Sequence, residues 1–116
     1  MVNDMKYFIT EEQRKASDST CYMEFMKGYY NDKCWLEDSI NIDAFLWDNL
    51  DLSKLIHSVN KDFDYYDLTV ITKEQWQEIT RISNETSGKW KEVIDEATPW
   101  VEECFREFEV FTISGM

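Results

Sequence analysis

Residues 71–100, ITKEQWQEITRISNETSGKWKEVIDEATPW, carry the clearest structural signal in the chain. Thr72 precedes Gln75 by three residues, the spacing of a capping box at the start of a helix. Apolar and half-polar residues then recur every three or four positions, a period that places them on one helical face. They are Trp76, Ile79, Ile82, Thr86, Trp90, Val93, Ile94 and Ala97. The stretch predicts an amphipathic helix over about 73–97, and Gly88 marks the place where it would be interrupted.

The residues after this stretch predict a second helix and a last strand. Thr98 followed by Pro99 is typical of an N-cap with proline at the first helical position, where its missing N–H costs nothing. The helix that begins there would carry Trp100, Val101, Cys104, Phe105 and Phe108. Segment 109–113, EVFTI, then reads as a terminal strand.

The N-terminal part contains the same start signal. Segment 6–9, KYFI, reads as a short strand, and Thr10 with Gln13 forms a second capping box. Five residues after it are spaced to share one helical face. They are Cys21, Tyr22, Phe25, Met26 and Tyr29. We therefore expect a helix over about 11–31, weakened at Gly28.

The middle of the chain has weaker patterns. Segment 35–42 is compatible with a strand or a loop, whereas segments 44–49 and 52–59 follow helical spacing. Segment 67–71, DLTVI, is rich in β-branched residues and predicts a brief extended piece.

Length and composition favour one domain over residues 1–116. Hydrophobic residues make up 43% of the chain and aromatic residues 16%, enough large side chains to build a core and to argue against wholesale disorder. The expected class is α+β, a mainly helical single domain with a small sheet formed by short terminal strands. The terminal strands would either pair with each other or flank a central strand.

The charge balance is strongly acidic, with 24 Asp and Glu against 12 Lys and Arg and a formal net charge of -12. Because like charges repel, we expect no direct binding to nucleic acid or to an anionic membrane. Cys21, Cys34 and Cys104 are odd in number and widely spaced, which favours reduced thiols. Residues 1–6 lack the pattern of a signal peptide, and no apolar stretch is long enough for a membrane span. A cytoplasmic location is expected.

No catalytic motif is recognisable in the chain. His57 is the only histidine and the three glycines are isolated, which disfavours histidine-based catalysis, metal binding and a phosphate loop. The acids of segment 62–67 lack the glycine and the final glutamate of a calcium loop. We expect a protein that is not an enzyme, with no catalytic residue, metal site or cofactor. A small enzyme that uses dispersed carboxylates is the alternative that 24 acids leave open.

Segment 62–67, DFDYYD, alternates acids with aromatic residues in an expected loop. Aromatic side chains supply buried contact area at protein interfaces, and carboxylates pair with arginine or lysine of a basic partner. A solvated acidic surface is the competing interpretation. The candidate partner-binding residues are Asp62, Asp64, Tyr65, Tyr66 and Asp67, followed by Asp48 and Asp51.

Three segments resemble parts of small bacterial immunity proteins, the inhibitors encoded beside contact-dependent or other polymorphic toxins. They are ITKEQW at 71–76, WVEECF at 100–105 and FTISG at 111–115. The resemblance covers residues 71–115 and implies a protein that binds one cognate toxin domain in the cytoplasm, often a nuclease, and blocks its active site. It carries over no catalytic residue, because such proteins need none.

The acidic charge agrees with this expectation. A nuclease needs a basic cleft for phosphates, toward which an inhibitor with a net charge of -12 would be steered. The alternative is a nucleic-acid-mimicking inhibitor or an acidic adaptor from a phage or mobile element. Acids are spread evenly, 11 in residues 1–60 and 13 in residues 61–116, which favours a mimic. The abundant aromatic residues favour a local interface instead.

Overall fold

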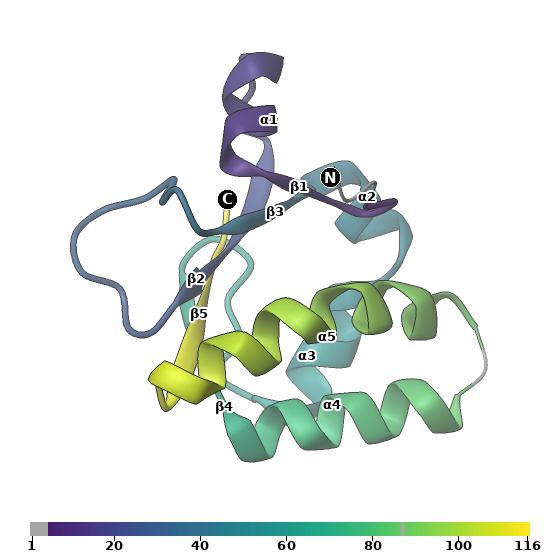
Figure 1. Ribbon diagram of the computed structural model, residues 1–116. Coiled ribbons are helices and arrows are strands. Elements are labelled where there is room, and N and C mark those ends of the chain that lie inside the picture. The colour runs from purple at the N-terminus through teal and green to yellow at the C-terminus, as the bar shows by residue number, and fades with distance from the viewer. Residues whose placement is uncertain (1–4, 87) are drawn as a thin grey trace.

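The computed structural model describes residues 5–86 and 88–116, which form an α+β fold around one antiparallel sheet (Figure 1). Five strands occur in these ranges: β1 Phe8–Thr10, β2 Tyr22–Lys27, β3 Ile40–Asp43, β4 Leu68–Thr72 and β5 Val110–Ser114. Five helices occur in the same described ranges: α1 Glu11–Ser17, α2 Ala44–Asn49, α3 Leu52–Val59, α4 Lys73–Glu85 and α5 Lys89–Glu107. The strand order is β1-β3-β2-β5-β4.

The prediction of a small sheet formed by the terminal strands is wrong. β5 lies inside the sheet between β2 and β4, and β1 lies at one edge beside β3. The two terminal strands therefore do not pair with each other. Three strands from the interior of the sequence complete the sheet, and one of them, β2, comes from a segment that we expected to be helical.

The predicted helix over 11–31 ends at Ser17. Asp18 adopts the left-handed conformation (φ 57°), and its N–H donates to the Lys15 carbonyl at 3.1 Å, which closes α1. Met23 and Phe25 then point to one face of the sheet, while the alternate residues of β2 are also buried on the other face. Met26 on the second face is as buried as Met23 and Phe25 on the first, which breaks the alternation of a surface strand, so the apolar residues matched helical spacing by coincidence.

The long helix expected over 73–97 is two helices, which separate around Gly88 (φ 151°). Ser87, which this prediction also covered, lies outside the described residues. The helix start expected at Thr98 and Pro99 is wrong, because α5 runs through Pro99 to Glu107. The Thr98 hydroxyl donates to the Ile94 carbonyl at 2.7 Å instead of capping a new helix. Both capping boxes, at Thr10 and Thr72, are confirmed.

The main core lies between one face of the sheet and helices α2 to α5. Phe111 of β5 is fully buried at its centre. Its ring centroid lies 5.3 Å from that of Phe25, 5.7 Å from Trp76, 5.8 Å from Trp100 and 6.0 Å from Phe105. This aromatic cluster fixes α4 and α5 on the sheet, because such rings bury large areas in defined geometries.

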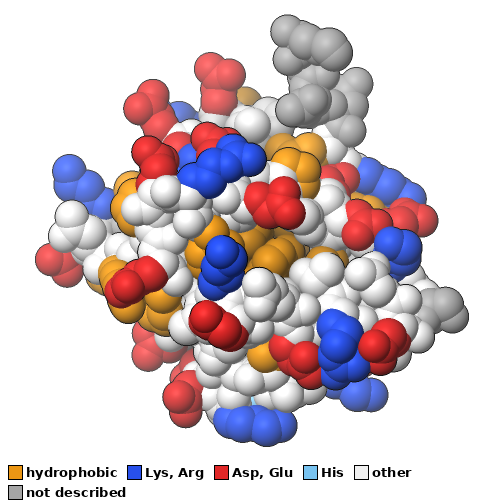
Figure 2. All heavy atoms as spheres, turned by 60° about the horizontal axis from the view of Figure 1, so that its bottom comes forward, with side chains coloured by type: hydrophobic (Ala, Val, Ile, Leu, Met, Phe, Trp, Pro, Cys, Tyr) orange, Lys and Arg blue, Asp and Glu red, His pale blue; other side chains and the backbone are white. Residues whose placement is uncertain are grey.

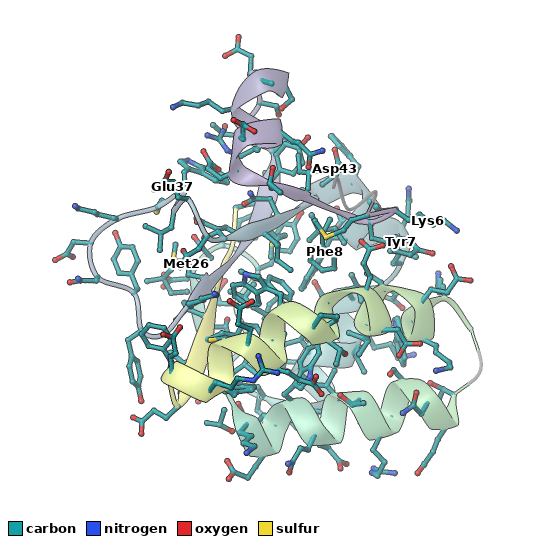
Figure 3. The ribbon with its side chains drawn as sticks, in the orientation of Figure 1. Lys6, Tyr7, Phe8, Met26, Glu37 and Asp43 are labelled. Atoms are coloured by element: carbon teal, nitrogen blue, oxygen red, sulfur yellow. The ribbon has the colours of Figure 1, made fainter. Side chains whose placement is uncertain are left out.

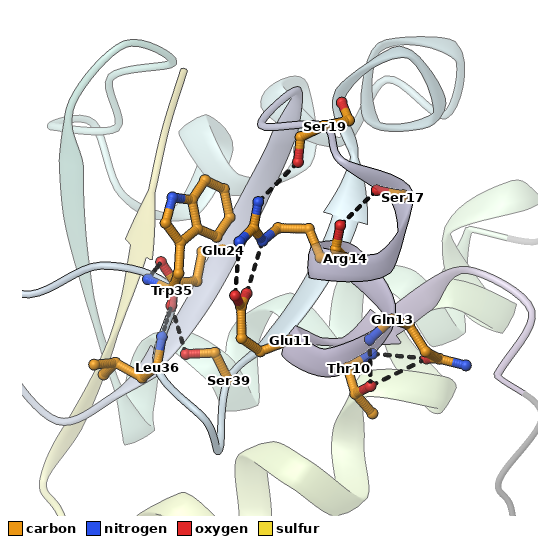
Figure 4. A network of polar contacts seen from close by, with 10 residues as sticks. All are labelled: Thr10, Glu11, Gln13, Arg14, Ser17, Ser19, Glu24, Trp35, Leu36 and Ser39. Atoms are coloured by element: carbon orange, nitrogen blue, oxygen red, sulfur yellow. Dashed lines mark hydrogen bonds and ion pairs between the residues drawn. The ribbon is translucent and has the colours of Figure 1, made fainter.

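The second face of the sheet is covered by α1 and segment 28–39 (Figure 4). Glu24 of β2 is buried there, and its carboxylate accepts hydrogen bonds from the Trp35 N–H at 2.8 Å and the Ser39 hydroxyl at 2.6 Å. Arg14 of α1 pairs with Glu11 at 2.7 Å and lies 4.0 Å from the Trp35 ring centroid. These bonds satisfy groups that would be costly to bury alone.

The N-terminal strand is tied to α5 by one carboxylate. Glu96 accepts hydrogen bonds from the backbone N–H groups of Lys6 at 2.7 Å, and of Tyr7 and Phe8 at 2.8 Å. The Tyr7 hydroxyl also donates to Glu92 at 2.7 Å, so Lys6 and Tyr7 run beside the helix (Figure 3).

Candidate partner-binding face

The candidate residues gather at one end of the sheet. β2 begins there at Tyr22 and β3 ends there at Asp43, and these two residues pair in register. Ser114, the last residue of β5, pairs with Leu68, the first residue of β4. α2 starts directly after β3, because the Asp43 carboxylate accepts a hydrogen bond from the Phe45 N–H at 2.8 Å. This end of the sheet therefore carries α2 and the loop before β4.

Tyr65 joins the loop to α2. Its hydroxyl donates to the Asp48 carboxylate at 3.3 Å, and its ring packs edge-on against Tyr66 with centroids 5.0 Å apart. Burial, followed by the nearby Asp48 charge, raises the pKa of Tyr65 above its ordinary value. Asp51 lies next to this pair, since its N–H donates to the Asp48 carbonyl at 3.0 Å.

Backbone hydrogen bonds to side chains hold the loop in shape. The Asp64 carboxylate accepts from the Tyr66 N–H at 2.9 Å, while the Asp64 N–H donates to the Thr69 hydroxyl at 3.2 Å. The Asp67 carboxylate accepts from the Leu68 N–H at 2.8 Å. Each bond uses one carboxylate oxygen at most, so the acids keep acceptor capacity for a partner.

The end of the chain supports the loop from behind. The Gly115 N–H donates to the Asp67 carbonyl at 2.9 Å, and the Met116 N–H donates to the Tyr65 carbonyl at 2.8 Å. A Cβ atom at Gly115 would clash with the Tyr65 carbonyl and approach the Asp67 oxygen to 2.9 Å. Only glycine allows this close approach between the two backbones.

Two aromatic side chains on this surface are largely exposed to solvent. Tyr66 is 76% exposed and Phe45, in the first turn of α2, is 71% exposed. Phe63 turns inward and stacks on Trp47 with centroids 6.0 Å apart, so it anchors the loop to the core. The sequence reasoning missed Phe45, although its three-residue spacing from Asp48 indicates a shared helical face.

Most of the predicted partner-binding residues lie together at this end of the sheet, but not all of them do. Asp62 lies in the turn after α3, at the opposite end of that helix from Asp51, and only its backbone N–H is bonded, to Asn60 at 2.9 Å. An eight-residue helix is about 12 Å long, so Asp62 is separated from Asp51, although Asp64 follows it by two residues. We call the joined set the acidic end face. It consists of Phe45, Asp48, Asp51, Asp64, Tyr65, Tyr66 and Asp67.

Ion pairs neutralise part of the acidic charge on the two long helices. On α4, Arg81 pairs with Glu78 and with Glu85, and on α5 Lys91 pairs with Asp95. Figure 2, which turns the lower part of Figure 1 forward, shows acidic and basic side chains interspersed. Within residues 5–86 and 88–116, none of the four carboxylates of the acidic end face forms an ion pair. The face therefore presents unneutralised negative charge beside exposed aromatic rings.

Other chemistry-bearing residues are dispersed. In the part of the chain that the structure describes, no group of three or more His, Cys, Asp or Glu residues is placed to hold a metal ion. His57 is exposed on α3. Cys21 and Cys34 are exposed free thiols, and burial raises the pKa of the Cys104 thiol. Among the described helices, none has both the length and the apolar composition to cross a membrane.

Comparison with family models, curated proteins and solved structures found no match to this chain.

Proposed function

We propose that this protein is an immunity protein, a non-enzymatic cytoplasmic inhibitor that binds a cognate bacterial toxin domain through the acidic end face. The observation that carries the proposal is that two exposed rings, Phe45 and Tyr66, lie on α2 and on the loop bonded to it, together with carboxylates that form no ion pair. A basic protein surface complements both features. The toxin best matched to this chemistry is a nuclease, because its cleft must attract phosphates.

The two features have different roles in binding. The unpaired carboxylates, in a chain of net charge -12, steer a basic partner toward the face and raise the association rate at low salt. Tyr66 and Phe45 supply the apolar contact area that holds the complex, since aromatic residues at the centre of an interface dominate its free energy. Tyr65 and Asp48 preorganise the surface, which limits the entropy lost on binding.

A nucleic-acid mimic is the second candidate, and charge pairing disfavours it. A mimic needs free carboxylates over most of one surface, whereas Glu78 and Glu85 on α4 are paired with Arg81, and Asp95 on α5 is paired with Lys91. The acidic end face instead combines unpaired carboxylates with exposed aromatic rings, which favours binding of a protein partner through one local interface.

The test compares two charge reversals of equal size. Asp64→Lys with Asp67→Lys changes the acidic end face, while Asp95→Lys with Glu102→Lys changes the solvent side of α5. The partner is the protein encoded beside this chain, and the association rate is measured by stopped flow. We expect the first variant to slow association roughly tenfold to a hundredfold at low salt and the second to leave it within about twofold. Equal slowing by both variants would support a mimic that acts through its overall charge.

A further inference from the structure

A pocket of about 370 Å³ opens at the opposite end of the sheet, where β4 ends and β5 begins. Three aromatic rings line it: Tyr29 after β2, Phe105 in the last turns of α5, and Phe108 directly after α5. Tyr29 is 59% exposed and Phe108 is 43% exposed, so both rings present apolar area to solvent. The rings come from two separate parts of the chain, the residues after β2 and the end of α5.

Three contacts hold the pocket in shape. Gly28 (φ 75°) packs so closely on the Phe108 ring that a Cβ atom there would lie 2.7 Å from it. The Gly28 N–H also donates to the Val110 carbonyl at 3.1 Å. The Tyr29 hydroxyl donates to the Glu109 carboxylate at 3.2 Å, and this bond raises the pKa of Tyr29. The rings are therefore positioned before any ligand arrives.

The charges that line the pocket favour a cation. Glu74 and Glu109 contribute carboxylates, against the single ammonium of Lys73. α5 ends at Glu107 beside the pocket and α4 begins there at Lys73, so the partial negative charge of one helix end offsets the partial positive charge of the other. The excess negative charge therefore comes from the two carboxylates. Aromatic faces attract cations, and the planar guanidinium stacks on rings while it donates to carboxylates.

We propose that this pocket binds an arginine side chain presented by a protein partner. The guanidinium stacks on Tyr29 and Phe108 and donates hydrogen bonds to Glu74 and Glu109. The site lies at the other end of the sheet from the acidic end face, so the inference does not depend on the proposed function.

The test is an NMR titration of the full chain with N-acetyl-arginine amide, with the neutral analogue N-acetyl-citrulline amide as the matched ligand control. We expect saturable shifts of the backbone amides of Gly28, Glu74 and Glu109, and none with citrulline. Glu74→Gln with Glu109→Gln should raise the dissociation constant roughly fivefold to tenfold. Both carboxylates lie at the surface, so the fold is retained, and an unchanged spectrum away from the pocket verifies this.

Asp64→Asn with Asp67→Asn on the acidic end face is the matched control variant, and it should bind the arginine probe as the wild type does. The proposal is overturned if arginine and citrulline shift the pocket equally, if the shifts map to the acidic end face, or if the pocket variant binds unchanged. Because the probe is an amino-acid derivative, these outcomes are distinct from a failure to bind a toxin.

Discussion

At the scale of single residues, Gly115 decides whether the acidic end face is rigid. Its backbone lies against Tyr65 and Asp67, which leaves no space for a side chain. The loop that presents Tyr66 therefore rests on the last residues of β5 and on the backbone that follows them. The residue type at position 115 does not by itself predict this packing. The packing depends on contact between segments that are distant in sequence.

We expect Gly115→Ala to destabilise the protein by about 1–3 kcal/mol, the usual cost of forcing an extra methyl group into a packed site. It should also weaken partner binding, because the loop must move away from the chain end. Ser114→Ala is the control, since it adds no atom. Chemical denaturation and binding assays measure the two effects, and wild-type stability of Gly115→Ala would contradict the close packing.

At the scale of elements, the capping boxes predicted two helix starts correctly, whereas the start expected at Thr98 and the end of the first helix were wrong. The capping boxes at Thr10 and Thr72 depend on three-residue spacing, which is visible in sequence. The end of α1 at Asp18 depends on a left-handed backbone conformation that aspartate adopts only in some contexts. The burial of β2 on both faces depends on segment 28–39, which no local pattern places over the sheet. The residues at 62–67 were found from composition, but Phe45 joined them only through the fold.

Glu96 provides a test of how β1 is attached to α5. Glu96→Gln keeps the shape of the side chain but removes the charge and one of its two acceptor oxygens, while three backbone N–H groups remain to be satisfied. We expect a loss of about 1–3 kcal/mol in the free energy of unfolding. Glu102→Gln, at an exposed position of the same helix, should cost nothing measurable. Equal stability of the two variants would show that β1 is held by its apolar contacts alone.

Glu92, one turn earlier on α5, predicts a pH dependence. The Tyr7 hydroxyl and then the Lys6 ammonium lower the pKa of Glu92 below its ordinary value of 4.5. Because the folded state favours the ionised form, this stabilisation is complete above the ordinary value and is lost as the pH falls through the lowered pKa. Glu92→Gln should therefore have a lower free energy of unfolding than the wild type at pH 7. This difference should shrink as the pH is lowered from 7 to about 3. Denaturation curves across that range measure this difference, and a gap that stays constant would contradict the assignment.

At the scale of the whole molecule, the end of the sheet that carries α2 and the surface of α4 and α5 differ in chemistry. The acidic end face combines unpaired carboxylates with Phe45 and Tyr66, whereas the α4–α5 surface carries neutralising ion pairs. Net charge could be read from composition, but which carboxylates lie together at one end of the sheet could be seen only in the fold. The central claim is that a basic protein binds at this end.

Site-specific photo-crosslinking tests that claim most directly. Phe45→p-benzoylphenylalanine and Tyr66→p-benzoylphenylalanine place the probe on the acidic end face, and the same change at Gln77 of α4 and Glu102 of α5 provides exposed controls. Each variant is co-expressed with the protein encoded beside this chain and irradiated in the cell. We predict that positions 45 and 66 crosslink to that protein, that it is basic and toxic when expressed alone, and that the control positions do not react. Crosslinks from the control positions alone, or none from any position, would contradict the account.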